Sequence, residues 1–420
     1  MEQILKPYRK DATALQSACS MKHPVSSCTP WNYVHHNHHE MSSLVDPLSD
    51  PVRINLIDTL RLAPPHWRHS ICLFAICLGI DRFEASIDQI ADPHTRWSGE
   101  ELREIVDDVR HATDSGLPRI QRQHLVSRVL QRQWLTPQSE LLSWYSIHRG
   151  LNPGGRGNIS ENLMYLRNFV SVDAKTTEDF WKETEDELPT IFESIELGTI
   201  FRNDQLVAKL RDLVIVHFAR SFEVREVHNS TWQSGIRTYT ESLQSNPRNL
   251  DRLFTLKRGH APDPENALAA RQEIINDFTG CSRQLFSSGL AFRFRILDLF
   301  EGSRLGWANS GIRILRPQAN SEFLIGDAPV IQIDRDHTRR AMSLNQPDNI
   351  QQMFLPIGPN FAVLLDRNDS NNGYEDISSD AVKRYNTWEV EAAERAIVMR
   401  MGSYLEHFPE TIRPAPPRTP

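Results

Sequence analysis

Side chains that can carry chemistry stand within otherwise apolar segments at three places in this sequence. The first is the segment 119–135, RIQRQHLVSRVLQRQWL, which contains His124, Arg128 and Arg132 four residues apart. This spacing predicts that the three lie on one face of a helix, opposite an apolar face. Two guanidinium groups and an imidazole on one face can bind phosphate. The alternative is a solvated cationic face, paired with the acidic segment 183–196.

The second place is the segment around His217 and Arg220, in HFARSFEVRE. The preceding residues, 213–218, are apolar almost throughout, so we expect a buried helix. His217 and Arg220 are three residues apart and share a face of it. A buried arginine must be paired or must line a cavity, because desolvation of an isolated charge is costly. The two residues therefore form either part of a binding site or a structural ion pair.

The third place is Asp327, which ends the run FLIGD just before Ala328 and Pro329. A carboxylate at the end of a buried strand is a candidate metal ligand or general base. The alternative is an Asp that accepts backbone N–H bonds in a turn. Two histidines and this aspartate suit a divalent metal, but the sequence alone does not complete a ligand set.

Other motifs in the sequence favour a structural interpretation. The histidines between 35 and 39 lack the H-E-x-x-H spacing, so we interpret them as a polar tract. The loop NPGGRGN, 152–158, does not match the phosphate-loop pattern. Cys72 and Cys77 lie in the apolar run ICLFAICLGI and are expected to be buried thiols.

The composition excludes several classes of protein. The 420 residues are 39% hydrophobic and 24% charged, which excludes wholesale disorder and a collagen-like chain. The net charge of −7 excludes a generally basic coat for nucleic acid. The longest apolar run has ten residues, 71–80, and a membrane-spanning helix needs about 20. We expect a cytoplasmic protein that does not bind a membrane, with cysteines typical of a reducing compartment.

The order of the predicted elements favours an α+β fold that is predominantly helical. We expect a flexible extension over 1–50, a small helical unit over 51–118, an α+β main domain over 119–405 and a Pro-rich tail over 406–420. Ser98 and Glu101 form a capping-box pattern at the start of one helix. A small antiparallel sheet is expected in the C-terminal third, from FRFRILDL, SGIRILRP, SEFLIGDAPVIQI and MFLPIGPNFAVLLD, with VKRYNTWEVEAAERAIVMR as the closing helix.

Several of these segments, in this order, resemble the bacterial domain of unknown function 4238 family. The similar motifs are QHLVSRVLQRQW, the glutamates at 183–193, HFARSFEVRE, SEFLIGDAPVI, MFLPIGPNFAVLL and RYNTWEVEAAERAIVMR. The resemblance spans roughly 120–400. Ser127 stands where the family usually has Pro, and a single His stands where a pair is common. The resemblance implies a fold and adds Asn386 as a candidate position, without implying a reaction.

Two functions are consistent with these observations. The first is a hydrolase that acts on a phosphate-bearing substrate such as nucleic acid. Its catalytic groups would be His124, His217 and Asp327, its substrate-binding groups Arg128, Arg220 and Asn386, with a divalent metal as a possible cofactor. The second is a non-catalytic interaction module of a bacterial cytoplasmic system. In that case the same polar residues are structural and the helical N-terminal unit recruits a partner.

Overall fold

The computed structural model describes residues 69, 72, 73, 76, 77, 84, 87–91, 98–114, 123–136, 141–148, 150–152, 164–166, 184–340 and 350–414. The predicted extension over 1–50, the histidine tract at 35–39 and most of the loop NPGGRGN lie outside the described residues. No helix in the described ranges is long and apolar enough to cross a lipid bilayer.

The described residues form α-helices and a few short 3-10 turns. The α-helices are α6 (Ile87–Ile90), α7 (Gly99–Asp114), α8 (Arg128–Gln131), α10 (Leu188–Glu196), α11 (Asp204–Ala219), α12 (Phe222–Ser245), α13 (Pro247–Arg258), α14 (Ala267–Ser287), α15 (Leu290–Gly306), α16 (Ser379–Ala392) and α17 (Phe408–Ile412). The 3-10 turns are η3 (Arg132–Trp134), η4 (Ile200–Arg202), η5 (Pro264–Asn266) and η7 (Tyr404–His407).

The strands of the described residues form three sheets. The strands are β1 (Gln123–His124), β2 (Leu142–Ser146), β3 (Gly150–Asn152), β4 (Tyr165–Leu166), β5 (Gly311–Pro317), β6 (Ile325–Gly326), β7 (Ile331–Asp334), β8 (Arg339–Arg340), β9 (Ile350–Gly358), β10 (Phe361–Asp366), β11 (Gly373–Ile377) and β12 (Ala396–Arg400). The strand orders are β11-β5-β10-β9-β7-β8, β3-β2-β12-β6 and β1-β4. All pairs are antiparallel except β11 with β5. The α+β class is therefore confirmed, with more sheet than predicted.

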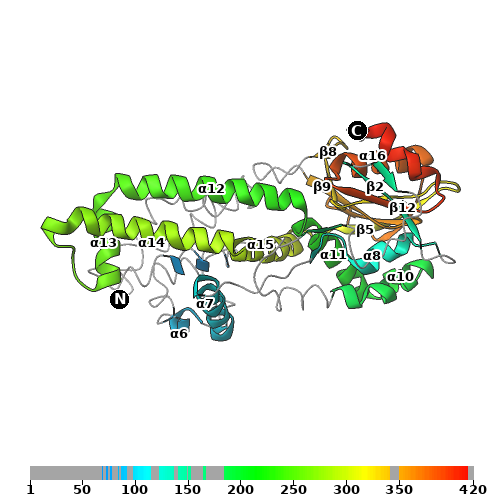
Figure 1. Cartoon of the computed structure of the whole chain (residues 1–420). Coiled ribbons are helices and arrows are strands. Elements are labelled where there is room, and N and C mark those ends of the chain that lie inside the picture. Colours follow the sequence, from blue (N-terminus) through cyan, green and yellow to red (C-terminus); the bar gives the residue numbers. More distant parts are fainter. Residues whose placement is uncertain are drawn as a thin grey trace, which may run out of the picture.

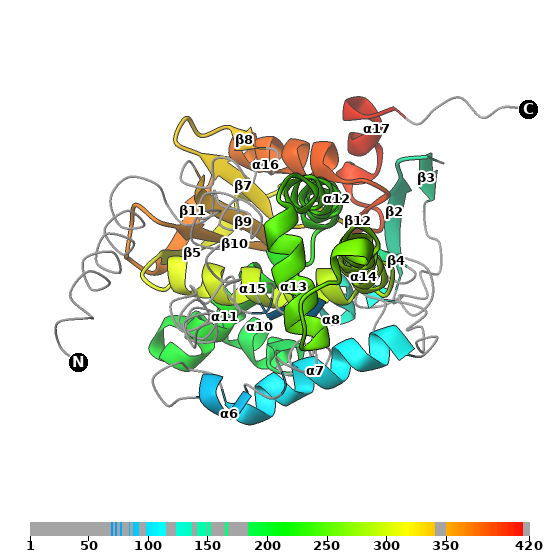
Figure 2. The ribbon, with the colours of Figure 1, turned by 90° about the vertical axis from the view of Figure 1, so that its left-hand side faces the viewer.

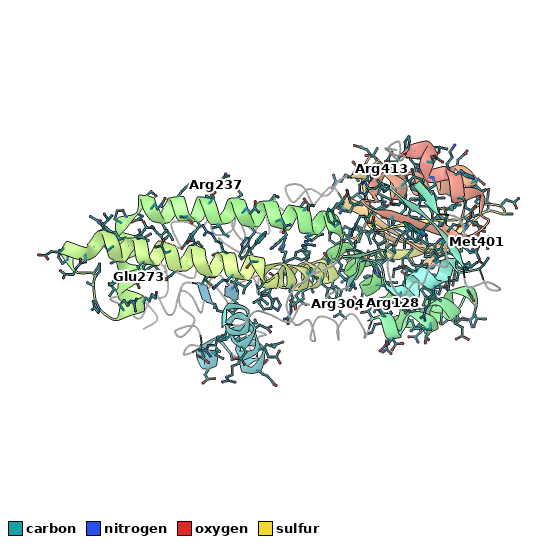
Figure 3. The ribbon with its side chains drawn as sticks, in the orientation of Figure 1. Arg128, Arg237, Glu273, Arg304, Met401 and Arg413 are labelled. Atoms are coloured by element: carbon teal, nitrogen blue, oxygen red, sulfur yellow. The ribbon has the colours of Figure 1, made fainter. Side chains whose placement is uncertain are left out.

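The molecule consists of a head that contains the two larger sheets and an arm of long helices that projects from it (Figure 1). The arm is built from α12, α13 and α14, and α15 runs back from it into the head (Figures 1 and 2). Side chains mark the same division, since Arg237 and Glu273 lie out on the arm, whereas Arg128 and Met401 lie on the head (Figure 3).

Helix caps in the sequence fix where the head joins the arm. The long helical segment that begins at α11 is interrupted at Ser221, whose Oγ accepts a hydrogen bond from the N–H of Val224 at 3.2 Å. Ser221 is thus the N-cap of α12, and Arg220 is the last residue of the α11 end. Gly259 ends α13 in the left-handed conformation, at φ 80°.

The core of the head lies between α11 and the two larger sheets. Its largest cluster contains Trp134, Leu213, Ile314, Leu355 and Val398, none more than 1% exposed. The indole N–H of Trp134 donates to the carbonyl of Phe323 at 2.9 Å. A second layer of apolar side chains packs α16 against the other side of the six-stranded sheet.

Several predicted elements are confirmed. Ser98 and Glu101 form the capping box, since the N–H of Ser98 donates to Glu101 Oε2 at 2.8 Å and the N–H of Glu101 donates to Ser98 Oγ at 3.0 Å. The predicted hairpin is formed by β9 and β10, with Pro359 and Asn360 in the turn. Asp327 directly follows a buried strand, β6, as expected.

Three predictions were wrong. The segment 119–135 is no continuous helix: His124 lies in β1, and α8 begins only after the N-cap Ser127, so His124, Arg128 and Arg132 do not share a helical face. The run FRFRILDL, 292–299, lies within α15. The closing helix ends at Ala392, and the run AIVMR becomes β12, which pairs with β2 and β6.

Candidate functional site

His217 is fully buried in α11 and binds backbone groups at both ring nitrogens. Its Nδ1 lies 2.9 Å from the carbonyl oxygen of Leu213, and its Nε2 lies 3.4 Å from the backbone nitrogen of Ser127. Nδ1 therefore carries the proton, and Nε2 accepts from Ser127. Burial, together with the nearby charge of Arg220, lowers the pKa of His217 to about 4, although the bond to the carbonyl of Leu213 opposes this change. The imidazole is neutral at physiological pH and holds the segment that precedes α8 against α11.

Arg220 lies at the junction of α11 and α12 and is 5% exposed. Its Nη1 is 3.8 Å from Oε1 of Glu185, in the acidic segment that precedes α10. This carboxylate partner agrees with the structural alternative, in which a buried guanidinium is neutralised by an ion pair.

The segment that carries His124 and Arg128 lies against α11 near His217. The N–H of Leu125 donates to the carbonyl of Met164 at 2.7 Å, which continues the pairing of β1 with β4. Ser127 caps α8 through its Oγ, which accepts from the N–H of Leu130 at 3.3 Å. Arg128 is exposed at the start of α8, and the side chain of His124 lies outside the described atoms. The first and second candidate segments therefore meet through Ser127 and His217.

Asp327 is 1% exposed and lies at the end of β6. Its Oδ1 accepts a hydrogen bond from the N–H of Glu394 at 2.8 Å. Its Oδ2 is buried and has no hydrogen-bond partner within the described ranges. Burial raises the pKa of Asp327 to about 6, although backbone N–H groups at 394, 395 and 327 oppose this rise.

Asn386 and Glu389 project from α16 toward the segment that leads into Asp327. Asn386 is 1% exposed, accepts from the N–H of Leu324 at 3.1 Å and donates to the carbonyl of Glu322 at 2.8 Å. Glu389 is 0% exposed, and its Oε2 accepts from the N–H of Gly326 at 2.9 Å. These bonds hold the β6 strand against α16, so Asn386 positions backbone in this structure.

The approach of Glu389 to β6 requires a glycine at position 326. A Cβ at Gly326 would lie 3.1 Å from the carbonyl oxygen of Glu389, 3.2 Å from its Oε2 and 3.2 Å from Cβ of Ala393. Such contacts are tight, so a larger residue would push α16 away from β6. Gly326 thereby brings Glu389 close to Asp327.

Asp327 and Glu389 form a pair of buried acids, which we call the acid pair. Oε1 of Glu389, like Oδ2 of Asp327, is buried without a hydrogen-bond partner in the part of the chain that the structure describes. Burial raises the pKa of Glu389 well above its ordinary value, and the charge of Asp327 raises it further. Burial therefore favours the protonated form of Glu389, while Asp327, with a pKa of about 6, ionises as the pH rises through that value.

Arg339 connects the acid pair with the junction of α11 and α12. Its guanidinium lies 3.6 Å from a carboxylate oxygen of Glu223, in the first turn of α12, and 3.6 Å from one of Glu391, in α16. Its charge also lowers the pKa of Glu389, against the stronger effect of burial. Both contacts, at 3.6 Å, are longer than a hydrogen bond, so a closer acceptor could replace either carboxylate.

The structure therefore forms two groups of candidate residues, one around Ser127 and His217 and one around Asp327 and Asn386. Arg339 contacts Glu223 of α12 and Glu391 of α16. In the described ranges, no three or more His, Cys, Asp or Glu side chains are arranged to hold a metal ion. A divalent ion near the acid pair would take Asp327 and Glu389 as ligands and would need further ligands from outside this set.

Glu389 and Arg339 were missed from the sequence. Glu389 had a readable signal: it shares the buried face of α16 with Val382, Tyr385, Asn386 and Val390, where a carboxylate is out of place. Arg339 had no such signal, because its partners come from distant segments.

We expect the acid stability of the protein to depend on His217. A His217→Leu variant loses two buried hydrogen bonds, so at pH 7 its free energy of unfolding should be lower by about 1–3 kcal/mol. Because the pKa of the folded state is about 4 against an ordinary 6.5, the wild type loses up to about 3 kcal/mol as pH falls through this range. The variant lacks that loss, so the difference in free energy of unfolding between wild type and variant should become smaller toward pH 4. Urea unfolding curves measure this difference.

His228 provides the matched control. Burial and the charges of Arg295 and Arg225 lower its pKa to about 3, and it packs among Trp232, Phe286 and Phe292. His228→Phe should reduce the same acid sensitivity without the loss at pH 7. An equal loss at pH 7 in both variants would contradict the role given to the bonds of His217.

Comparison with known proteins gives a family and no activity. No curated protein and no solved structure matches the chain. A family model described as "Protein of unknown function (DUF4238)" matches residues 122–403, a range that includes α12–α15 of the arm and junction as well as β1, α11, β6 and α16. The acid pair, Arg339 and every predicted site residue lie inside this match. Because the match covers more than half of its length, the chain belongs to the DUF4238 family.

Proposed function

We propose that this protein is a hydrolase that cleaves a phosphate-bearing substrate, such as nucleic acid, with the acid pair as its general acid and base. The observation that supports this most strongly is the pair of buried carboxyl oxygens, Asp327 Oδ2 and Glu389 Oε1, that lack partners in the described ranges. Buried polar atoms are usually satisfied, and acids with raised pKa values cluster at functional sites.

The two acids suit opposite steps of phosphoester hydrolysis. Asp327, ionised above its pKa of about 6, takes a proton from a water molecule that attacks phosphorus. Glu389, whose protonated form burial favours, gives its proton to the leaving oxygen as the P–O bond breaks. One water is consumed, and the pair returns to its starting state once the proton passes from Asp327 to Glu389.

Arg339 is the proposed phosphate-binding cation. Its two ion pairs are 3.6 Å long, and its partners Glu223 and Glu391 are partly exposed and able to turn away. A phosphate group offers shorter, bidentate hydrogen bonds in their place. Asp327 itself lies beneath the exposed residues Glu394 and Arg395, so displacement of this short segment would give a substrate access.

Kinetic assays on full-length protein test this proposal. We expect the wild type to hydrolyse p-nitrophenyl phosphate, bis(p-nitrophenyl) phosphate or a short oligonucleotide, with kcat falling on the acid side near pH 6. Asp327→Asn and Glu389→Gln should each lower kcat by about 10²–10⁴, which is typical of a lost general acid or base. Arg339→Met should mainly raise KM.

The control for these variants is Asp376→Asn. Asp376 is an exposed carboxylate of β11 that pairs with Arg316 at 2.7 Å, away from the acid pair. It should leave kcat and KM within about threefold, since exposed ion pairs contribute little. Full activity in Asp327→Asn, or no turnover of any phosphoester by the wild type, would contradict the hydrolase.

The second candidate is a non-catalytic interaction module of a bacterial cytoplasmic system, and the arm favours it. Helices α12, α13 and α14 project away from both larger sheets (Figure 1), as expected of a surface that reaches a partner. The local partners of His217, Arg220 and Asn386 also agree with structural roles. A wild type without phosphoesterase activity would favour this function.

A further inference from the structure

Two cysteines from distant parts of the chain meet at the base of the arm. Sγ of Cys77 lies 2.8 Å from Sγ of Cys281, which belongs to α14. The residues are 204 positions apart in the sequence. The separation is within about 1 Å of the S–S bond length of roughly 2.05 Å, so bond formation needs little movement of either chain segment.

Packing holds both thiols in this position. Cys77 and Cys281 both lie against the apolar cluster that includes Leu73, Ile76 and Leu285. Cys77 also contacts a second cluster, which includes Phe278 of α14. Both cysteines are partly buried and neither is fully enclosed, whereas Cys72 nearby is 0% exposed. A small oxidant therefore has access to this pair and less access to Cys72.

We propose that Cys77 and Cys281 are a covalent modification site, at which a hydroperoxide converts the two thiols into an intramolecular disulfide. The disulfide would join the helical segment around residue 77 to α14 of the arm. This proposal is independent of the proposed hydrolase activity, since neither cysteine contacts the acid pair.

The electrostatics of the pair set the order of the steps. The hydrogen bond between the two sulfurs lowers the pKa of Cys281, whereas the same bond and burial raise the pKa of Cys77. The Cys281 thiolate is thus the nucleophile. It attacks one peroxide oxygen, the O–O bond breaks, and sulfenic acid forms at Cys281 with release of water or an alcohol. The sulfur of Cys77 then displaces the hydroxyl group as a second water, so the two thiols lose two electrons and the peroxide gains them.

Mass mapping of the full-length wild type tests the proposal without any substitution. Reduced protein is treated with a small excess of hydrogen peroxide, blocked with N-ethylmaleimide and digested without reductant. The expected product is a peptide pair joining Cys77 to Cys281, at least about tenfold more abundant than any other cysteine pair, since oxidation follows thiolate character and exposure. The intact mass should fall by two hydrogen atoms and recover after dithiothreitol.

Three variants test the order of the steps. Cys77→Ser should leave a sulfenic acid at Cys281 that dimedone labels, and Cys281→Ser should abolish rapid peroxide consumption at this site. Cys72→Ser, from the same segment, should form the Cys77–Cys281 disulfide as the wild type does. A disulfide of Cys72 with Cys281, or accumulation of sulfinic acid at Cys281 while Cys77 stays reduced, would overturn the proposal.

Discussion

Replacing Asp327 by asparagine should raise the free energy of unfolding near pH 8 by about 3 kcal/mol. The pKa of Asp327 is about 6 in the folded protein against an ordinary 3.8, because the carboxyl is buried. Below pH 3.8 the carboxyl is protonated in both states and adds no penalty. As pH rises above 3.8, the carboxyl ionises in the unfolded chain before it ionises in the folded protein, so the free energy of unfolding decreases until the pH exceeds about 6. Asparagine removes that decrease and retains an oxygen for the N–H of Glu394.

The measurement is urea unfolding of wild type and variant at pH 4 and pH 8. The two curves should nearly coincide at pH 4 and separate at pH 8, with the variant more stable. A catalytic carboxylate is expected to destabilise the folded protein at pH 8, because reactive groups often lower the stability of the site that contains them. The gain in stability should therefore accompany the loss of kcat.

Asp366→Asn is the matched control, because Asp366 is a buried carboxylate that is bonded at both oxygens. It accepts from Gln352 Nε2 at 2.6 Å and from the N–H of Asn368 at 2.8 Å. Neutralising it removes charge-assisted bonds, so this variant should be less stable than the wild type by about 1–3 kcal/mol. If Asp327→Asn were destabilised in the same way at pH 8, Asp327 would be a structural anion and no general base.

Local patterns in the sequence predicted some elements and misled on others for identifiable reasons. The capping box at Ser98 and the turn at Pro359 and Asn360 depend on neighbouring residues, so the sequence contains all the necessary information. The run 292–299 alternates Phe and Arg, which suggests a strand, yet α15 buries it on nearly all sides. Burial on all sides removes the helical period on which the assignment depends.

The residues at which helices begin were less predictable than the helices themselves. Ser127 and Ser221 each begin a helix by capping, and each follows residues that also suit a helix. A serine can cap or continue a helix, and tertiary contacts decide which it does. At Ser127 the deciding contacts include the pairing of β1 with β4 and the bond from its N–H to His217.

The residues of the candidate site also differ in whether a local sequence pattern reveals them. Asp327 was predicted because the boundary of a buried strand is a local feature. Glu389 could have been found as the one carboxylate on the buried face of α16. Arg339 could not, because its contacts with Glu223 and Glu391 depend on how α12, α16 and β8 pack together.

Replacing Asp298 by alanine should destabilise the protein most, by about 3–5 kcal/mol, as expected when one partner of a buried charge pair is removed. Asp298 is 0% exposed in α15, and its charge opposes the lowering of the pKa of buried Arg295 by desolvation. Its Oδ1 also accepts from the backbone N–H of His69 at 3.1 Å and lies 3.0 Å from His69 Nδ1. The ring of His69 stacks on Phe294, at 5.3 Å between centroids.

The loss should come from the charge left in the core rather than from the missing contacts alone. A double variant, Asp298→Leu with Arg295→Met, removes both charges and should recover much of the stability, because apolar replacement of a buried ion pair is often neutral or better. Asp88→Asn serves as the control, since Asp88 pairs with Arg103 at 2.6 Å and both side chains are exposed, so it should cost about 1 kcal/mol or less. The measurement is urea unfolding of the wild type, Asp298→Ala, the double variant and the control. If the double variant were as unstable as Asp298→Ala, the contact of Asp298 with His69 would be the main stabilising interaction. The attachment of residue 69 to α15 would then outweigh the neutralisation of Arg295.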